Sequence, residues 1–166
     1  MLYEEMNKKR YDIAQICLNG HIINDMHDTH PEYNQKFCED CGEETITTCQ
    51  ECNTNIDGTL LMPNGTCIYL ETPPNYCAHC GKPYPWTKTA LEAAKELAQE
   101  IDGLSLEERE VLSKSIDEIV KGGPKTVVAT TRFKKIATKF GTGIGTAFRD
   151  ILVDVASESA KKMLWP

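Results

Sequence analysis

The sequence predicts an α+β protein, with small β modules in tandem in residues 1–86 and an α-helical domain of about four helices in residues 87–166. All eight cysteines lie between Cys17 and Cys80, whereas the long helical patterns begin only after Trp86. The connecting segment, residues 82–86, reads KPYPW, and each proline disfavours a helical conformation in the residue before it. The boundary between the two parts is therefore expected at residues 85–87.

The first part is expected to form short strands and tight turns. Residues 11–18 show a partial alternation of apolar and polar side chains, and residues 45–49 and 67–70 are rich in β-forming residues. Dipeptides that favour turns occur around these segments. They are Asn19-Gly20, Asp57-Gly58 and Asn64-Gly65.

Four amphipathic helices are expected in the second part, because apolar residues recur there at helical spacing. Thr87 is predicted to cap the first helix, and Ser105 with Glu108 forms a capping box that opens the second. Short loops between amphipathic helices indicate a small bundle or stacked hairpins. The third and last helices are predicted over residues 125–140 and 146–164.

Charge divides the chain into an acidic front and a basic tail. The net charge of −7 is the sum of −8 in residues 1–86, −5 in residues 87–120 and +6 in residues 121–166. No run of about 18 apolar residues exists, so no membrane span is expected. Asp150, Asp154 and Glu158 on the polar face of the last helix argue against a membrane partner. The first 15 residues do not have the pattern of a secretory signal, and paired cysteines favour metal ligation in a reducing compartment. A cytoplasmic location is therefore expected.

Seven cysteines and one histidine fall into four ligand pairs. Three pairs are C-x-x-C motifs, in which a tight turn brings two thiolates to one ion, and the fourth is C-x-x-x-H with an Asn-Gly turn. A structural zinc site takes four such ligands in a tetrahedron, so the sequence predicts two structural Zn²⁺ ions per chain. The ligand pairs are Cys17 with His21, Cys38 with Cys41, Cys49 with Cys52, and Cys77 with Cys80.

An internal repeat bears on how these pairs combine. Residues 17–41 and 49–81 each contain a ligand pair, an isoleucine, a variable loop and then an aromatic residue before C-x-x-C-G. Either consecutive pairs share an ion, or the first and third pairs do. The repeat favours consecutive pairs, since each unit then closes its own site. Both arrangements use all eight ligands and leave no open position for a catalytic metal.

The remaining cysteine and histidines are expected to stay outside the metal sites. Cys67 lies in an apolar strand pattern, which predicts a buried and inert thiol. His79 stands between two ligands, where ring geometry disfavours its own ligation. His27 and His30 belong to a polar segment, residues 25–34, which predicts a solvated loop.

The first part resembles the double zinc ribbon modules of bacterial proteins. The similarity lies in Cys49-x-x-Cys52 with Ile56 and Gly58, and in Tyr76-Cys77-x-x-Cys80-Gly81. Two further motifs and the closing Pro83-Tyr84-Pro85-Trp86 look like an uncharacterised bacterial family, a domain of unknown function. These motifs are Cys17-x-Asn19-Gly20-His21 and Phe37-Cys38-x-x-Cys41-Gly42. The resemblance implies tandem zinc ribbons and a prokaryotic cytoplasmic setting, but no activity. The first ligand pair and the long loop at residues 53–76 depart from the usual ribbon pattern.

A non-catalytic role in protein–protein interaction is the expected function, because zinc ribbons usually supply recognition surfaces. The chain would then be an adaptor with a protein partner, and the C-terminal helices would be candidates for self-association. No phosphate-binding loop, nucleophile motif or paired catalytic carboxylates are found. The GTGIG segment at residues 141–145 lacks a preceding strand, so it predicts a helix-breaking linker instead.

Nucleic-acid binding through the basic segment 121–140 is the alternative. Basic side chains that could contact phosphates cluster there, with two phenylalanines nearby. Acidic residues around the C-x-x-C motifs would repel phosphate, so a solvated face paired with the acidic front is the favoured interpretation of this segment. The candidate residues are Lys125, Arg132, Lys134, Lys135 and Lys139.

Overall fold

The computed structural model describes residues 8–166 and divides the chain into two compact units. Unit 1 ends at Thr87 and unit 2 begins at Lys88, one residue beyond the division expected from the sequence. The boundary falls within the helix α2 (Pro85–Glu100), which starts with a proline at its first position. Proline is favoured at a helix start, because its missing N–H would have no partner there. Thr87, predicted to cap this helix, instead lies inside its first turn, where it is buried and bonds to Asn75.

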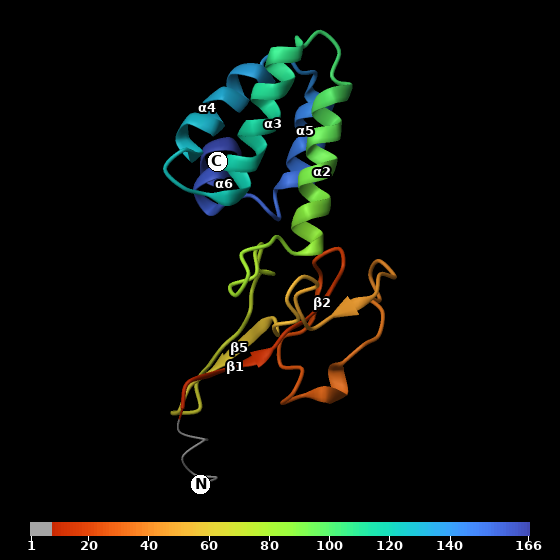
Figure 1. The fold of residues 1–166 in the computed structure, drawn as a ribbon, viewed down its shortest axis with the longest axis vertical. Helices are drawn as coiled ribbons and strands as arrows, with labels where there is room; N and C mark the ends of the chain where they lie inside the picture. The colour runs from red at the N-terminus through yellow and green to blue at the C-terminus, as the bar shows by residue number, and fades with distance from the viewer. Residues whose placement is uncertain (1–7) are drawn as a thin grey trace. The chain divides into compact units, whose positions relative to one another are not determined.

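Unit 1 contains two small antiparallel sheets of three strands each, and β1 and β5 run side by side (Figure 1). The predicted strand at residues 11–18 is divided between the two sheets. The chain leaves the first sheet at Ala14, whose amide donates to Ile56 O (2.8 Å). The first sheet has the order β1 (Arg10–Ile13), β5 (Asp57–Leu61), β6 (Cys67–Ile68); the second has the order β3 (Ile22–Asn24), β2 (Gln15–Cys17), β4 (Thr45–Ile46).

The apolar core of unit 1 is small. Its aromatic part is Tyr84 and Trp86, whose rings stack with centroids 4.8 Å apart, and Trp86 Nε1 donates to Pro74 O (2.9 Å). Two members of this core, Cys49 and Cys77, are candidate metal ligands. Its fully or nearly buried members are Ala14, Ile16, Cys49, Ile56, Cys77, Tyr84 and Trp86.

Buried polar side chains hold the long loops of unit 1. Asp12 accepts hydrogen bonds from the amides of Asp28 (3.0 Å) and Thr29 (3.2 Å) and from the Thr29 hydroxyl. Burial by itself raises the pKa of Asp12, but these hydrogen bonds outweigh it and hold the pKa below its ordinary value. The Asn24 side-chain amide also holds this loop, because its Nδ2 donates to His30 O (2.8 Å). The loop also contains the short helix η1 (Pro31–Tyr33), so it is an ordered part of the unit.

Unit 2 contains five helices where about four were predicted. The predicted helix at 146–164 is two helices, because Ser157 leaves the helical path. The Ser157 amide donates to Ile119 O (3.0 Å), and its hydroxyl caps α6. The GTGIG segment is not a linker, because α5 already begins at Thr142. The helices after α2 are α3 (Leu106–Lys121), α4 (Thr126–Ala137), α5 (Thr142–Leu152) and α6 (Glu158–Leu164).

Aromatic packing forms the centre of unit 2. Phe148 of α5 is fully buried and lies 5.4 Å from both Phe133 of α4 and Phe140, measured between ring centroids. α3 and α4 lie side by side (Figure 1), and α3 contributes a buried apolar face to this core. The capping box of α3 is present, with Ser105 and Glu108 bonding to each other's backbone amides. The apolar periodicity of the sequence thus corresponds to a real helical core.

Among the described residues, no helix is both long and apolar enough to cross a membrane. A spanning helix requires about 20 apolar residues. The longest helices, α2 and α3, have 16 residues each and carry charges along their length.

Candidate metal centres

Unit 1 gathers the eight candidate ligands into two groups of four. Within each group, one ligand atom from every residue lies within 4.8 Å of all the others. This is the consecutive grouping favoured by the repeat, and the first and third pairs do not share a site. The first group is Cys17, His21, Cys38 and Cys41; the second group is Cys49, Cys52, Cys77 and Cys80.

The spacing of the ligand atoms fits a tetrahedral metal ion. Four sulfurs about 2.3 Å from a central zinc lie roughly 3.8 Å apart, and a sulfur and an imidazole nitrogen lie roughly 3.6 Å apart. In the first group, Cys17 Sγ is 3.8 Å from Cys41 Sγ, and Cys38 Sγ is 3.5 Å from His21 Nδ1. In the second group, Cys49 Sγ is 3.7 Å from Cys80 Sγ, and Cys52 Sγ is 3.7 Å from Cys77 Sγ. These distances are too long for disulfides, which need about 2.05 Å, and all eight cysteines are free.

The three C-x-x-C motifs share one backbone conformation. In each, the amide of the first cysteine donates to the carbonyl five residues on, and its own carbonyl accepts from the amide four residues on. That fourth residue has a positive φ, at Gly42 (76°), Asn53 (57°) and Gly81 (72°). A β-bridge closes each turn, for example Tyr76 with Pro83. Local sequence therefore suffices to place two thiols side by side, because glycine and asparagine tolerate this conformation.

The Cys17–His21 pair uses a different turn. The Cys17 amide donates to His21 O (3.0 Å), and Gly20 takes the positive φ of 90°. A Cβ at Gly20 would lie 3.0 Å from Trp86 Cβ, so the turn needs glycine for both its conformation and its packing. Trp86 therefore connects the turn of the first group with Tyr84, which lies beside the second.

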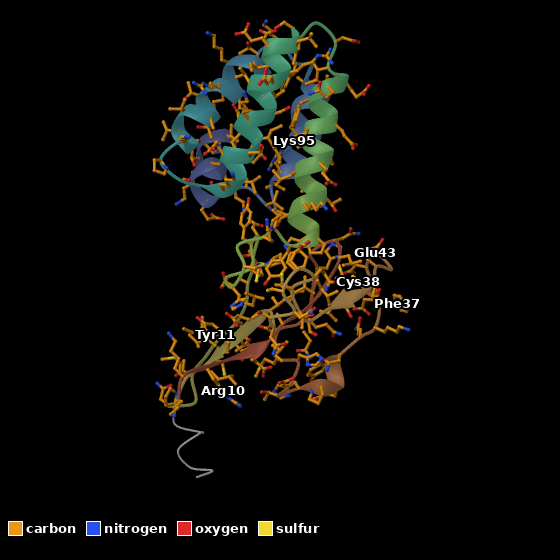
Figure 2. The ribbon with its side chains drawn as sticks, in the orientation of Figure 1. Arg10, Tyr11, Phe37, Cys38, Glu43 and Lys95 are labelled. Carbon is orange, nitrogen blue, oxygen red and sulfur yellow. The ribbon has the colours of Figure 1, made fainter. Side chains whose placement is uncertain are left out.

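The two groups differ in their surroundings. Cys49 and Cys77 of the second group belong to the apolar core of unit 1. In the first group, Cys17 and Cys38 are buried, but His21 and Cys41 are exposed. Cys38 lies between exposed Phe37 and Glu43 side chains (Figure 2). Water and competing ligands therefore have easier access to the first group.

The thiols of both groups have shifted acidities. The backbone amide of Glu43 lowers the pKa of Cys41 to about 7, and the amide of Cys80 lowers the pKa of Cys77 to about 6. Burial, with a smaller contribution from hydrogen bonds to the Cys41 and Cys38 thiols, raises the pKa of Cys17 to about 11. A divalent cation at the centre of each group would favour the thiolate form of every member.

Tyr84 is a residue that ligand counting does not identify. It is 4 % exposed and forms a hydrogen bond with Cys77. Burial, followed by the charge of Cys77, raises the pKa of Tyr84 well above its ordinary value. The only sequence signal for this contact is the aromatic motif that closes the repeat, Tyr84-Pro85-Trp86. Tyr84 therefore joins the second group to the stacked aromatic core.

The other candidate residues lie outside both groups. His79 is exposed, as expected, and only its backbone amide contacts Cys77 Sγ (3.4 Å). Cys67 was expected to be buried, but it is only half-buried, because β6 is a two-residue strand at the edge of its sheet. His27 and His30 bond to Asp28 (2.9 Å) and Glu32 (3.1 Å), and they belong to neither metal group.

The basic candidates of unit 2 lie along α4 and just before and after it. Arg132 lines two grooves between α3 and α4, one with Lys125 and the other with Lys135 and Lys139, while Lys134 lines neither. Acidic side chains of α3 line the same grooves, and Lys139 is paired with Glu108. The positive charge of this face is therefore partly neutralised within unit 2.

Comparison with known families identifies the family of this chain. A family described as an uncharacterised protein conserved in bacteria (DUF2321) matches residues 10–164. The chain belongs to this family. The match covers residues of both units. Neither a curated protein nor a solved structure matches the chain.

Proposed function

We propose that this DUF2321 protein is a zinc-stabilised protein-interaction module of the bacterial cytoplasm, without catalytic activity. The proposal is carried by the two groups of four ligand atoms at tetrahedral spacing, in a unit whose apolar core is small. Metal ions in these groups would stabilise the folded loops, because a small module without bound metal buries little apolar surface. With all four ligands supplied by protein, neither ion offers an open position for substrate. The proposed binding function therefore belongs to the surface of unit 1, whose folded conformation the metal ions would stabilise.

Zinc is the ion that the ligand sets favour. A Cys₃His set and a Cys₄ set at tetrahedral spacing are both common in structural zinc sites. Iron–sulfur clusters use Cys₄ sets predominantly, and His21 in the first group fits them less well. Metal analysis of protein purified without chelators should give two zinc ions per chain. A visible charge-transfer spectrum with iron in place of zinc would contradict this assignment.

Exposed apolar side chains in unit 1 support the interaction role. Tyr33, Phe37 and Tyr69 are each more than half exposed. Tyr33 ends the short helix η1, Phe37 forms a β-bridge with Glu44, and Tyr69 directly follows β6. Such side chains are enriched where proteins bind one another, since they bury a large area with little loss of side-chain entropy. Their presentation on a rigid unit is the second support for a binding function.

Capture from the native cell is the direct test of the proposed function. The intact chain is used as bait in nuclease-treated and untreated extracts, beside a Cys77→Ser/Cys80→Ser variant that lacks a complete second group. We expect the same proteins to be captured with or without nuclease, and to be lost with the variant. Capture that nuclease abolishes would contradict a direct protein partner.

Nucleic-acid binding is the second candidate, because Lys125, Arg132 and Lys135 are exposed in the grooves of α4. Such binding would weaken steeply with salt, since it releases counterions from phosphates. The test is titration with DNA and RNA of mixed sequence at low and moderate salt. Binding that Lys134→Glu/Lys135→Glu abolishes would favour this function, and no binding at low salt would exclude it.

A further inference from the structure

A groove in unit 1 lies beside the second metal group and encloses about 450 Å³. Three tyrosines line it, together with one leucine and one proline. We call it the tyrosine groove. The lining residues that matter here are Tyr11, Asp57, Leu70, Pro74, Tyr76 and Tyr84.

The aromatic wall of the tyrosine groove is rigid on one side and accessible on the other. Tyr84 is buried, stacks on Trp86 and bonds to Cys77, so its ring is fixed. Tyr11 extends from the edge strand β1 and is 53 % exposed (Figure 2). The strand register aligns Tyr11 with Leu60, and Leu60 with Ile68, which is 57 % exposed. Because paired residues lie on the same face of a sheet, this row extends the apolar surface beyond the groove.

Charge distinguishes among the ligands that an aromatic groove accepts. The lining contains one carboxylate, Asp57, which is exposed, and no lysine or arginine. Residues 1–86 as a whole carry 13 acidic and 5 basic side chains. This field disfavours the phosphates of a nucleic acid and favours a ligand with a positive charge near Asp57.

Proline-containing segments match the shape and chemistry of such a groove. A polyproline II segment has no internal hydrogen bonds, presents ridges of proline rings, and loses little entropy on binding. Aromatic-lined grooves recognise these segments by packing rings against proline while hydroxyl groups bond to the exposed carbonyls. We propose that the tyrosine groove binds an extended, proline-containing peptide segment with a basic residue placed at Asp57. This inference rests on the proposed interaction function and names the class of partner.

Fluorescence polarisation with labelled peptides tests the inference on the intact, zinc-loaded protein. The probe is an octapeptide, Arg-Pro-Leu-Pro-Pro-Leu-Pro-Arg, compared with a version in which alanine replaces proline and one in which glutamate replaces arginine. We expect saturable binding of the first peptide, and at least about fivefold weaker binding of the other two. Tyr11→Ala should weaken binding by a similar factor, and Asp57→Lys should reverse the preference between arginine and glutamate peptides. Leu106→Ala is the control, because Leu106 is 85 % exposed but lies outside the groove.

Several outcomes would overturn this inference. They are no saturable binding by a protein with full zinc content, equal effects of the Tyr11 and Leu106 substitutions, and displacement of the peptide by oligothymidylate. Light scattering that shows a dimer lost in Tyr11→Ala would make a second copy the occupant instead. If the peptides do not bind while the chain still captures a protein from its native cell, the proposed interaction function stands. The partner then binds a surface other than the tyrosine groove.

Discussion

The two units of this chain are stabilised in different ways. Unit 2 has a continuous apolar core, with Phe148 fully buried among two other phenylalanines and the apolar faces of its helices. Unit 1 has a small core in which two of the buried residues are candidate metal ligands. It also buries polar side chains such as Asp12 and Asn24, which bond to loop backbone. Helices can combine long apolar stripes into one core, whereas the short strands and long loops of unit 1 also depend on hydrogen bonds from buried polar side chains.

Metal removal should have the largest effect, and it should separate the two units. Chelation is expected to unfold unit 1 completely while the helical signal of unit 2 persists, because the free energy of metal binding is folding free energy in such modules. The measurement is circular dichroism combined with limited proteolysis. The first group should lose its metal before the second, since His21 and Cys41 are exposed. A proteolytically intact unit 1 after full metal removal would falsify the structural role of the metal.

Loss of a core aromatic ring should have the converse effect. Phe148→Ala is expected to destabilise unit 2 by about 3–5 kcal/mol, because it removes a buried ring and leaves a cavity. Urea denaturation followed at 222 nm measures this change, and zinc content should stay at the wild-type value. Phe37→Ala is the control, because Phe37 is 53 % exposed, and it should change stability by less than about 0.5 kcal/mol. Equal effects of the two substitutions would contradict the described core.

Loss of one buried carboxylate should weaken unit 1 by a smaller amount. Asp12→Asn places an amide donor against the backbone donors of Asp28 and Thr29, and should cost about 1–3 kcal/mol with zinc bound. Hydrogen exchange of the amides in residues 27–30 would show the loss directly as faster exchange. Asp28→Asn is the matched control, since the Asp28 side chain is 63 % exposed. An unchanged exchange rate in Asp12→Asn would mean that the carboxylate does not hold the loop.

The smallest expected effect is a pH dependence of unit 2. The Lys139 side chain, followed by the Ser105 amide, holds the pKa of Glu108 below its ordinary value. A carboxyl group whose pKa is lower in the folded state contributes stability that is present above its unfolded pKa and is lost as pH falls through the folded pKa. The Tm of the metal-free protein, followed at 222 nm, should therefore fall as the pH is lowered from about 6 to about 3. Glu108→Gln should reduce this fall and Glu107→Gln should not; the opposite order would contradict the assignment.

Several features were predictable because they depend on neighbours in sequence. The C-x-x-C turns need only a short segment and a residue that tolerates positive φ, such as Gly42 or Gly81. The capping box at Ser105 is equally local. The division of the chain near Trp86 follows from the distribution of cysteines and helical periods. The repeat also indicated the grouping of ligands, because two pairs joined by a single loop can close one site.

Other features were decided by contacts between distant residues. The sequence at 146–164 has an unbroken apolar stripe, yet α5 ends at Leu152, and the Ser157 amide beyond it donates to Ile119 O of α3. Thr87 has the side chain of a helix cap, but Asn75 holds it inside the first turn. Cys67 lies in an apolar pattern, but the edge position of β6 leaves it half-buried. The tyrosine groove likewise joins β1 to residues some 60 to 70 positions later.

The sequence by itself therefore identified the eight candidate ligands that the structure gathers into two groups, the tight turns that present them and the helical character of the second unit. These depend on residue type and local backbone conformation. Only the tertiary structure decided which helix ends early, which polar groups are buried and which tyrosines share a groove. Those outcomes depend on hydrogen-bond partners and packing neighbours that are far apart in the chain, such as Ser157 with Ile119 and Tyr11 with Leu60.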